Sequence, residues 1–117
     1  LPVEDEPALL DLAAETLRAL GYAVTTARTG DTALQMLRDE EPVDLLLSDV
    51  VMPGQLDGIG LARAARDLHP ALPVVFMSGY TGAVRGKDLA ELGVVLRKPC
   101  APEDLARAIR AQLDLTA

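Results

Sequence analysis

The chain has 117 residues, of which 18 are acidic and 11 basic, and its net charge is −7 at pH 7. This length suits one compact domain, so we expect a single domain over residues 1–117. Half of the residues are hydrophobic, which excludes a mainly disordered chain. The acidic balance argues against nucleic acid as a partner, because a nucleic-acid-binding face needs clustered Lys and Arg. It also argues against direct contact with an anionic membrane surface.

Cysteine content and apolar runs indicate the cellular location to expect. Cys100 is the single cysteine, so an internal disulfide is impossible and a reducing, cytoplasmic location is expected. The longest segment without Asp, Glu, Lys or Arg, 68–84, contains Pro70 and Pro73. We therefore expect no membrane span.

The first half of the chain alternates short strands with helices. Residues 1–3 are typical of the end of a strand whose beginning is clipped, and Pro7 suits the first turn of a helix that Gly21 ends. β-branched residues favour a strand over 22–27. A second helix opens at 29–31 and stops at Pro42, and the apolar run 43–48 indicates a buried strand. The apolar face of the first helix is expected to hold Leu9, Ala13, Leu17 and Leu20.

The second half continues this alternation. Residues 52–58 are typical of a loop by their Pro and Gly content, and a third helix follows. Strands are expected at 73–77 and 94–97, with a weak helix over 82–92 between them. The last helix starts at Pro102. The expected apolar faces are Leu61, Ala65 and Leu68 on the third helix, and Leu105, Ile109 and Leu113 on the last.

This pattern predicts an α/β fold. Five strands alternating with helices favour a doubly wound, five-stranded parallel sheet with helices on both faces and right-handed crossovers. In such open sheets, ligands bind beyond the carboxyl ends of the strands. The residues at those ends are therefore the candidates for function.

Polar side chains follow four of the predicted strands. Glu4, Asp5 and Asp49 would converge at one edge, where like charges repel and a hard divalent cation such as Mg²⁺ relieves the repulsion. Lys98 supplies a compact positive charge and Ser78 a hydroxyl donor. A carboxylate, a metal, an ammonium and a hydroxyl suit phosphoryl transfer, in which a carboxylate can itself be the nucleophile.

Each of these residues also has a purely structural interpretation. The acidic run 4–6 suits a helix N-terminus, Asp49 could cap the end of a strand, and Ser78 could be an ordinary turn residue. Their occurrence together favours the chemical interpretation.

Four motifs, in order at the predicted strand ends, resemble a known family. They are Val3-Glu4-Asp5-Glu6-Pro7, Asp44-Leu-Leu-Leu-Ser-Asp49-Val-Val-Met52-Pro53, Met77-Ser78-Gly79-Tyr80 and Lys98-Pro99. Over essentially the whole chain, this set resembles the receiver domain of two-component response regulators. The loop 53–58 and the segment 78–81 are most similar to receivers of hybrid histidine kinases. The resemblance implies the flavodoxin-like strand order 2-1-3-4-5.

The resemblance also implies a magnesium site. Asp5 corresponds to a direct Mg²⁺ ligand, with Glu4 acting through water. Asp49 corresponds to both a ligand and the phosphoacceptor, and the backbone carbonyl of Val51 to a further ligand.

The other implied roles concern the phosphoryl group and its consequences. Lys98 would neutralise charge during transfer, and Ser78 would bond the new phosphoryl group as the domain switches conformation. The donor would be a histidine kinase or a histidine phosphotransfer domain. A downstream protein would bind the face made by the helix at 82–92, the strand at 94–97 and the last helix. The domain would be regulatory rather than an enzyme acting on other substrates, and could belong to a membrane-tethered hybrid kinase.

Two rival functions stay open at this point. Val95 stands where the family often has a switching aromatic, and Cys100 where it often has Phe, which suits a receiver-like docking module with little phosphorylation. A phosphohydrolase working through an aspartyl phosphate is the second rival. Against this rival, the chain has no second carboxylate in an Asp-x-Asp spacing with Asp49 that could serve as the general acid or base.

Overall fold

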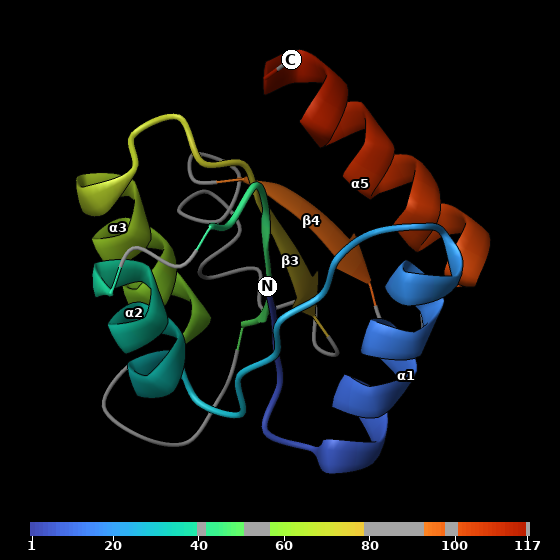
Figure 1. Ribbon diagram of the computed structural model, residues 1–117, viewed down its shortest axis with the longest axis horizontal. Helices are drawn as coiled ribbons and strands as arrows, with labels where there is room; N and C mark the ends of the chain where they lie inside the picture. Colours follow the sequence, from blue (N-terminus) through green and yellow to red (C-terminus); the bar gives the residue numbers. More distant parts are fainter. Residues whose placement is uncertain (40–41, 51–56, 79–92, 98–100, 117) are drawn as a thin grey trace.

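The computed structural model describes residues 1–39, 42–50, 57–78, 93–97 and 101–116. Parallel strands form a central sheet, and helices cover both of its faces (Figure 1). The predicted helix at 82–92 lies outside the described residues. The strands are β1 (Pro2–Val3), β2 (Leu46–Asp49), β3 (Val74–Ser78) and β4 (Val94–Arg97); the helices are α1 (Pro7–Ala19), α2 (Gly30–Arg38), α3 (Gly58–Leu68) and α5 (Pro102–Thr116).

The sheet has the predicted parallel topology. Its order is β1-β2-β3-β4, and every neighbouring pair is parallel. Ala27 adds an isolated parallel bridge to Val3 on the outer side of β1. Counting the segment 22–27 as the second strand of the chain, the spatial order is the predicted 2-1-3-4-5.

The predicted strand at 22–27 is reduced to that single bridge. The N–H of Ala27 donates to the carbonyl oxygen of Pro2 at 3.0 Å, and the N–H of Glu4 donates to that of Ala27 at 3.2 Å. The next bond in such a ladder would come from the N–H of residue 2, which proline does not have. Val3 with Ala27 is the one bridge between this segment and β1 in the described part of the chain.

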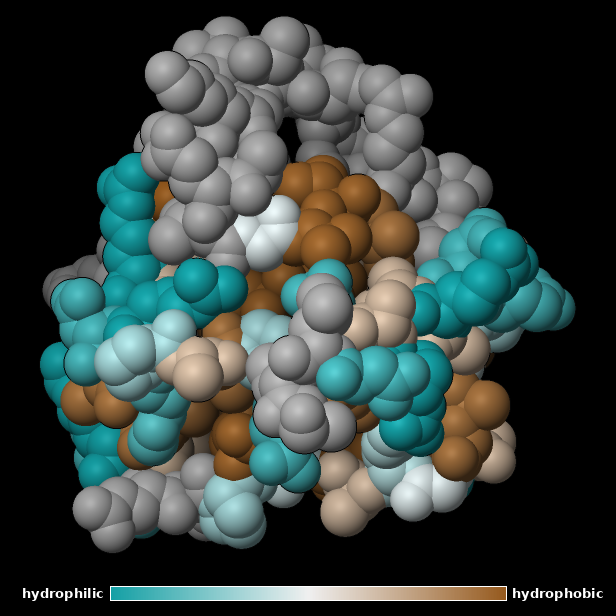
Figure 2. All heavy atoms as spheres, turned by 90° about the horizontal axis from the view of Figure 1, so that it is seen from above, coloured by the Kyte–Doolittle hydropathy of each residue, from teal (hydrophilic) through white to brown (hydrophobic). Residues whose placement is uncertain are grey.

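Alternating side chains of the strands supply two cores. Leu46, Val74 and Phe76 are buried on the side covered by α2 and α3. Leu47 and Val75 are buried on the opposite side, covered by α1 and α5. Seen from above, hydrophobic residues form a patch in the upper middle of the view, with hydrophilic residues on both sides of it (Figure 2). Both faces of the sheet are therefore apolar, as the continuous apolar runs predict.

The buried face of α1 differs in part from the predicted one, since Leu17 is buried and Ala13 half-buried as expected. Leu10, Ala14 and Leu17 are buried, whereas Leu9 and Leu20 are exposed. Leucines occupy two adjacent stripes of this helix, and packing against the sheet selects only one of them. Gly21 ends the helix as expected, with a φ of 96° that glycine adopts without strain.

The apolar faces of the other helices are mostly as predicted. Leu61 and Ala65 of α3 are buried, but Leu68 at its end is exposed. Leu105 and Ile109 of α5 are buried. Within the described part of the chain, no helix is long and apolar enough to cross a membrane.

Candidate functional site

Three carboxylates meet at the carboxyl ends of β1 and β2. Val3 pairs with Ser48 across these parallel strands, so the residues that follow, Glu4 and Asp49, emerge side by side. Together with Asp5, each offers a carboxylate oxygen, and these oxygens all lie within 4.8 Å of one another. The predicted convergence of these three side chains is confirmed.

The three side chains differ in exposure. Glu4 is buried, with 8% of its surface accessible, Asp49 is half-buried, and Asp5 is exposed. Grouped negative charges repel strongly where solvent screening is reduced. A cation bound beside the exposed Asp5 would relieve this repulsion.

The chemistry of this donor set fits Mg²⁺. Mg²⁺ prefers oxygen ligands at about 2.0–2.1 Å and is usually held by one or two carboxylates, with water and phosphate completing the shell. Oxygens sharing such an ion lie about 3–4 Å apart. The carboxylate oxygens of Asp5 and Asp49 lie within 4.8 Å of each other, which is close to this range.

The backbone next to Asp49 orients its carboxylate. The N–H of Val50 donates to Asp49 Oδ1 at 2.9 Å. The N–H of Val50 also donates to the carbonyl oxygen of Met77 on β3 at 3.2 Å. The group that holds the Asp49 carboxylate is thus itself tied to the neighbouring strand.

The first turn of α3 packs against the backbone of Asp49 and Val50. The N–H of Gly58 donates to the carbonyl oxygen of Val50 at 2.8 Å. A Cβ atom at position 58 would collide with the carbonyl oxygen of Asp49 and lie 2.9 Å from the Cα of Val50. Asp57 caps the helix, its Oδ1 accepting a hydrogen bond from the N–H of Gly60 at 2.8 Å.

Gly58 falls at the end of the loop predicted at 52–58. The signal available in the sequence was the pair Asp57-Gly58 directly before a helical pattern, where Asp is a preferred N-cap. That signal identifies the start of a helix. It does not reveal that the helix start touches the backbone of Asp49.

The remaining predicted site residues are described only in part. Ser78 is the last residue of β3, and Asp49 pairs with Met77 just before it, so the backbones of Ser78 and Asp49 lie at the same edge of the sheet. Lys98, Val51 and Cys100 lie outside the described residues.

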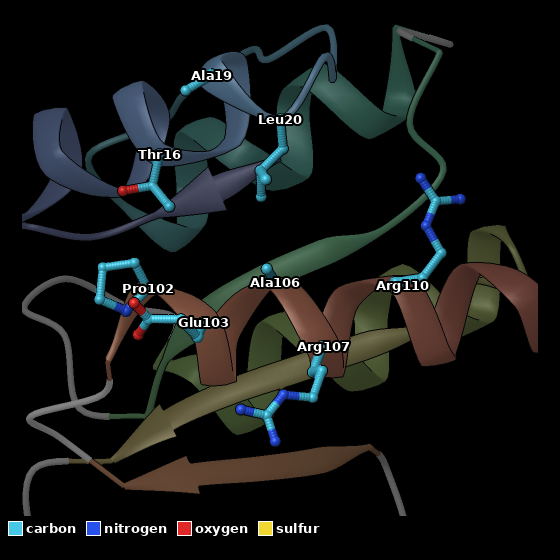
Figure 3. A pocket seen from close by; sticks show the side chains of 8 residues that line it. All are labelled: Thr16, Ala19, Leu20, Pro102, Glu103, Ala106, Arg107 and Arg110. Atoms are coloured by element: carbon cyan, nitrogen blue, oxygen red, sulfur yellow. The ribbon is translucent and has the colours of Figure 1, made fainter.

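A second surface feature is an open groove between α1 and α5 (Figure 3). Two arginines that line it approach acidic residues of α5: Arg107 approaches Asp104 at 3.4 Å, and Arg110 approaches Asp114 at 3.7 Å. The groove therefore offers a contact surface rather than groups for phosphoryl chemistry. It is lined by Thr16, Ala19, Leu20, Pro102, Glu103, Ala106, Arg107 and Arg110.

Comparison with known families gives one match over most of the chain. Residues 1–110 match the family described as the response regulator receiver domain.

Two curated relatives show the range of proteins that carry a similar sequence. The response regulator receiver protein CpdR of Brucella abortus (strain 2308) is 36% identical over 115 residues, which cover 97% of this chain and 94% of CpdR. The sensor kinase CckA of the same strain is 36% identical over 118 residues, which cover 97% of this chain but 12% of CckA. Similar sequences thus occur both alone and within a much longer kinase.

Solved structures match the fold closely. A response regulator receiver protein from Sinorhizobium medicae WSM419 superposes with a TM-score of 0.92 at 28% identity, covering 99% of this chain and 94% of that one. The receiver domain of NtrX from Brucella abortus gives a TM-score of 0.87 at 30% identity, covering 97% and 96% of the two chains.

Proposed function

The chain belongs to the response regulator receiver domain family, and from this membership we propose that Asp49 is its phosphoacceptor. The general role of the family is that of a regulatory phosphoacceptor in two-component signalling. One observation carries the assignment to Asp49: its carboxylate lies within 4.8 Å of those of Glu4 and Asp5, at the carboxyl ends of neighbouring parallel strands.

The proposed reaction is an in-line transfer from phosphohistidine. A carboxylate oxygen of Asp49 attacks phosphorus, a P–O bond forms, and the P–N bond of the donor breaks. The departing imidazole nitrogen keeps the bonding electron pair and takes a proton from solvent. Val50 holds Oδ1 of Asp49 through its N–H, which fixes the direction from which the carboxylate attacks.

The metal site would use the same carboxylates. Asp5 and Asp49 would bind Mg²⁺ directly, Glu4 through water, and Val51 through its backbone carbonyl. Bound Mg²⁺ supplies charge neutralisation on the transferring phosphoryl oxygens. Lys98 would add a second positive charge, and Ser78 would donate a hydrogen bond to the phosphoryl group after transfer.

Receiver domains interact with histidine kinases or phosphotransfer proteins and with downstream targets. We propose a phosphohistidine of a kinase or phosphotransfer domain as the donor for this chain. For the output, we propose a downstream protein that binds the face made by residues 82–92, β4 and α5. On β4, Val95 is 39% exposed and offers an apolar contact.

The proposal extends to where the domain acts and whether it stands alone or belongs to a longer protein. We propose that residues 1–117 act as one cytoplasmic regulatory unit that catalyses only its own phosphorylation and dephosphorylation. The relatives CpdR and CckA support both a separate receiver and a receiver within a hybrid kinase.

Intact mass measurement tests this proposal. The chain is incubated with a small-molecule phosphodonor, with and without Mg²⁺, alongside Asp49→Asn. We expect one added phosphoryl group with Mg²⁺ only, and none on the variant. Asp114→Asn, an exposed carboxylate on α5, is the matched control and should be phosphorylated like the original chain.

The exposure of Val95 favours a second candidate function, which is docking without phosphorylation. An exposed aliphatic residue on β4 suits a constitutive docking surface better than a rotating aromatic switch. If the chain takes no phosphoryl group from a small donor or from a phosphohistidine protein, docking without phosphorylation replaces the proposal.

A further inference from the structure

Ser48 places a hydroxyl in an otherwise apolar layer of the core. It is fully buried, with 0% of its surface exposed. It pairs with Val3 on one side and Phe76 on the other, and both belong to the hydrophobic cluster beneath α2 and α3. Burying a hydroxyl among apolar side chains costs free energy unless it forms a hydrogen bond.

The hydroxyl is satisfied by the backbone of Asp49. Oγ of Ser48 donates to the carbonyl oxygen of Asp49 at 2.8 Å. The last residue pair between β1 and β2 is Val3 with Ser48, so Asp49 lies one step beyond that ladder. The bond thus restrains a carbonyl just where pairing with β1 has ended.

This restraint reaches the carboxylate through one peptide group. The carbonyl of Asp49 and the N–H of Val50 belong to the same planar peptide, so fixing one fixes the direction of the other. That N–H donates to Asp49 Oδ1 at 2.9 Å. Gly58 also packs closely against this carbonyl, which leaves the peptide little room to rotate.

We propose that Ser48 is a positioning residue for phosphorylation: its hydroxyl fixes the Asp49–Val50 peptide and thereby orients the carboxylate of Asp49. The inference rests on the proposed function of Asp49. It predicts an effect on the rate of transfer at saturating donor and Mg²⁺, because orientation rather than donor binding is changed.

The test compares four variants with the original chain. Ser48→Ala removes the hydroxyl, Ser48→Cys keeps the volume but is a weak donor, and Ser48→Thr keeps the hydroxyl. Val74→Ala removes buried methyl groups from the same layer, on the strand next to β2, without touching the Asp49–Val50 peptide. Phosphorylation by a small phosphodonor is followed by intact mass at saturating donor and Mg²⁺, and the Tm of each variant is recorded.

We expect Ser48→Ala and Ser48→Cys to be phosphorylated about tenfold more slowly, since small misplacements of a reacting group cost that much or more. Ser48→Thr should restore the rate, and Val74→Ala should react normally at temperatures where it is folded. Normal rates for Ser48→Ala and Ser48→Cys would overturn the inference. So would an equal loss of rate in Val74→Ala, or a folded Ser48→Thr that stays slow. If the original chain takes no phosphoryl group from the small donor or from a phosphohistidine protein, the proposed function fails instead.

Discussion

The Cα of Gly58 lies so close to Asp49 that any side chain at position 58 would collide with the Asp49 carbonyl oxygen. The start of α3 and the end of β2 are thereby held in direct backbone contact. The additional hydrogen bond from the N–H of Gly58 to the carbonyl oxygen of Val50, at 2.8 Å, keeps the two elements in this position.

Gly58→Ala should therefore disturb the site as well as the fold. The added methyl group forces the Asp49 backbone to move, and we expect a loss of about 1–3 kcal/mol in the free energy of unfolding. Phosphorylation should slow by more than this loss explains at temperatures where the variant is folded. Urea unfolding and intact mass after phosphodonor treatment measure the two effects.

Gly93→Ala is the matched control for that variant. Its Cβ would collide with the backbone of Val74, at the start of β3 and away from the carboxylates. It should lose similar stability but keep its phosphorylation rate. Equal slowing of both variants would show that the contact at Gly58 has no special link to Asp49.

The carboxylate cluster predicts that removing one of its charges stabilises the fold without Mg²⁺ and makes it less stable than the original chain with Mg²⁺. Without Mg²⁺, Asp5→Asn should raise the Tm, because it relieves repulsion from Glu4 and Asp49. With Mg²⁺ at about 100 times its Kd, the original chain should gain about 2.7 kcal/mol, and the variant much less. Thermal unfolding in chelator and in Mg²⁺ checks both signs.

Asp11→Asn serves as the control, since Asp11 is an exposed carboxylate on α1. Its Tm should respond to Mg²⁺ like that of the original chain. A response of Asp5→Asn to Mg²⁺ equal to that of the original chain would exclude Asp5 as a ligand.

The cap of α3 provides a further test. Asp57→Ala removes the hydrogen bond between Asp57 Oδ1 and the N–H of Gly60, and Thr29→Ala removes the equivalent cap of α2, where the N–H of Thr32 donates to Thr29 Oγ1. Each substitution should lower the free energy of unfolding, measured with urea, by about 1 kcal/mol. Only Asp57→Ala should also slow phosphorylation, because only α3 starts against Asp49. The same rate for both variants would contradict this link.

The two leucine stripes of α1 predict different costs of truncation. Leu17 is 5% exposed and Leu12 is 58% exposed. Leu17→Ala should lower the free energy of unfolding by about 2–5 kcal/mol. Leu12→Ala should change it by less than about 0.5 kcal/mol, as is usual for surface positions. Chemical denaturation of both variants measures the difference, and similar losses would contradict the observed orientation of α1.

Strand and helix order could be predicted from the sequence because the signals are local. Apolar runs, Pro7 and the Thr29 cap each depend on a few neighbouring residues. Two features depend on distant partners and could not be predicted. The segment 22–27 pairs with β1 next to Pro2, which is far away in sequence and has no N–H to donate. The choice between the leucine stripes of α1 is made by the sheet that the helix packs on.

Some features of the candidate site could likewise be predicted from the sequence, and others could not. Glu4, Asp5 and Asp49 could be predicted to converge because parallel strands bring their carboxyl ends to one edge. The contacts of Ser48 and Gly58 with the Asp49 carbonyl could not. A buried serine and a glycine before a helix are ordinary in sequence, and only the backbone geometry shows what they touch.

Chemical trapping of the phosphorylated residue tests the central claim most directly. Borohydride reduces an aspartyl phosphate to homoserine, and peptide mapping then locates the modified position. After reaction with a phosphodonor and Mg²⁺, we expect homoserine at position 49 alone. Modification at Glu4 or Asp5 instead, or a borohydride-stable phosphate on Ser78, would contradict it.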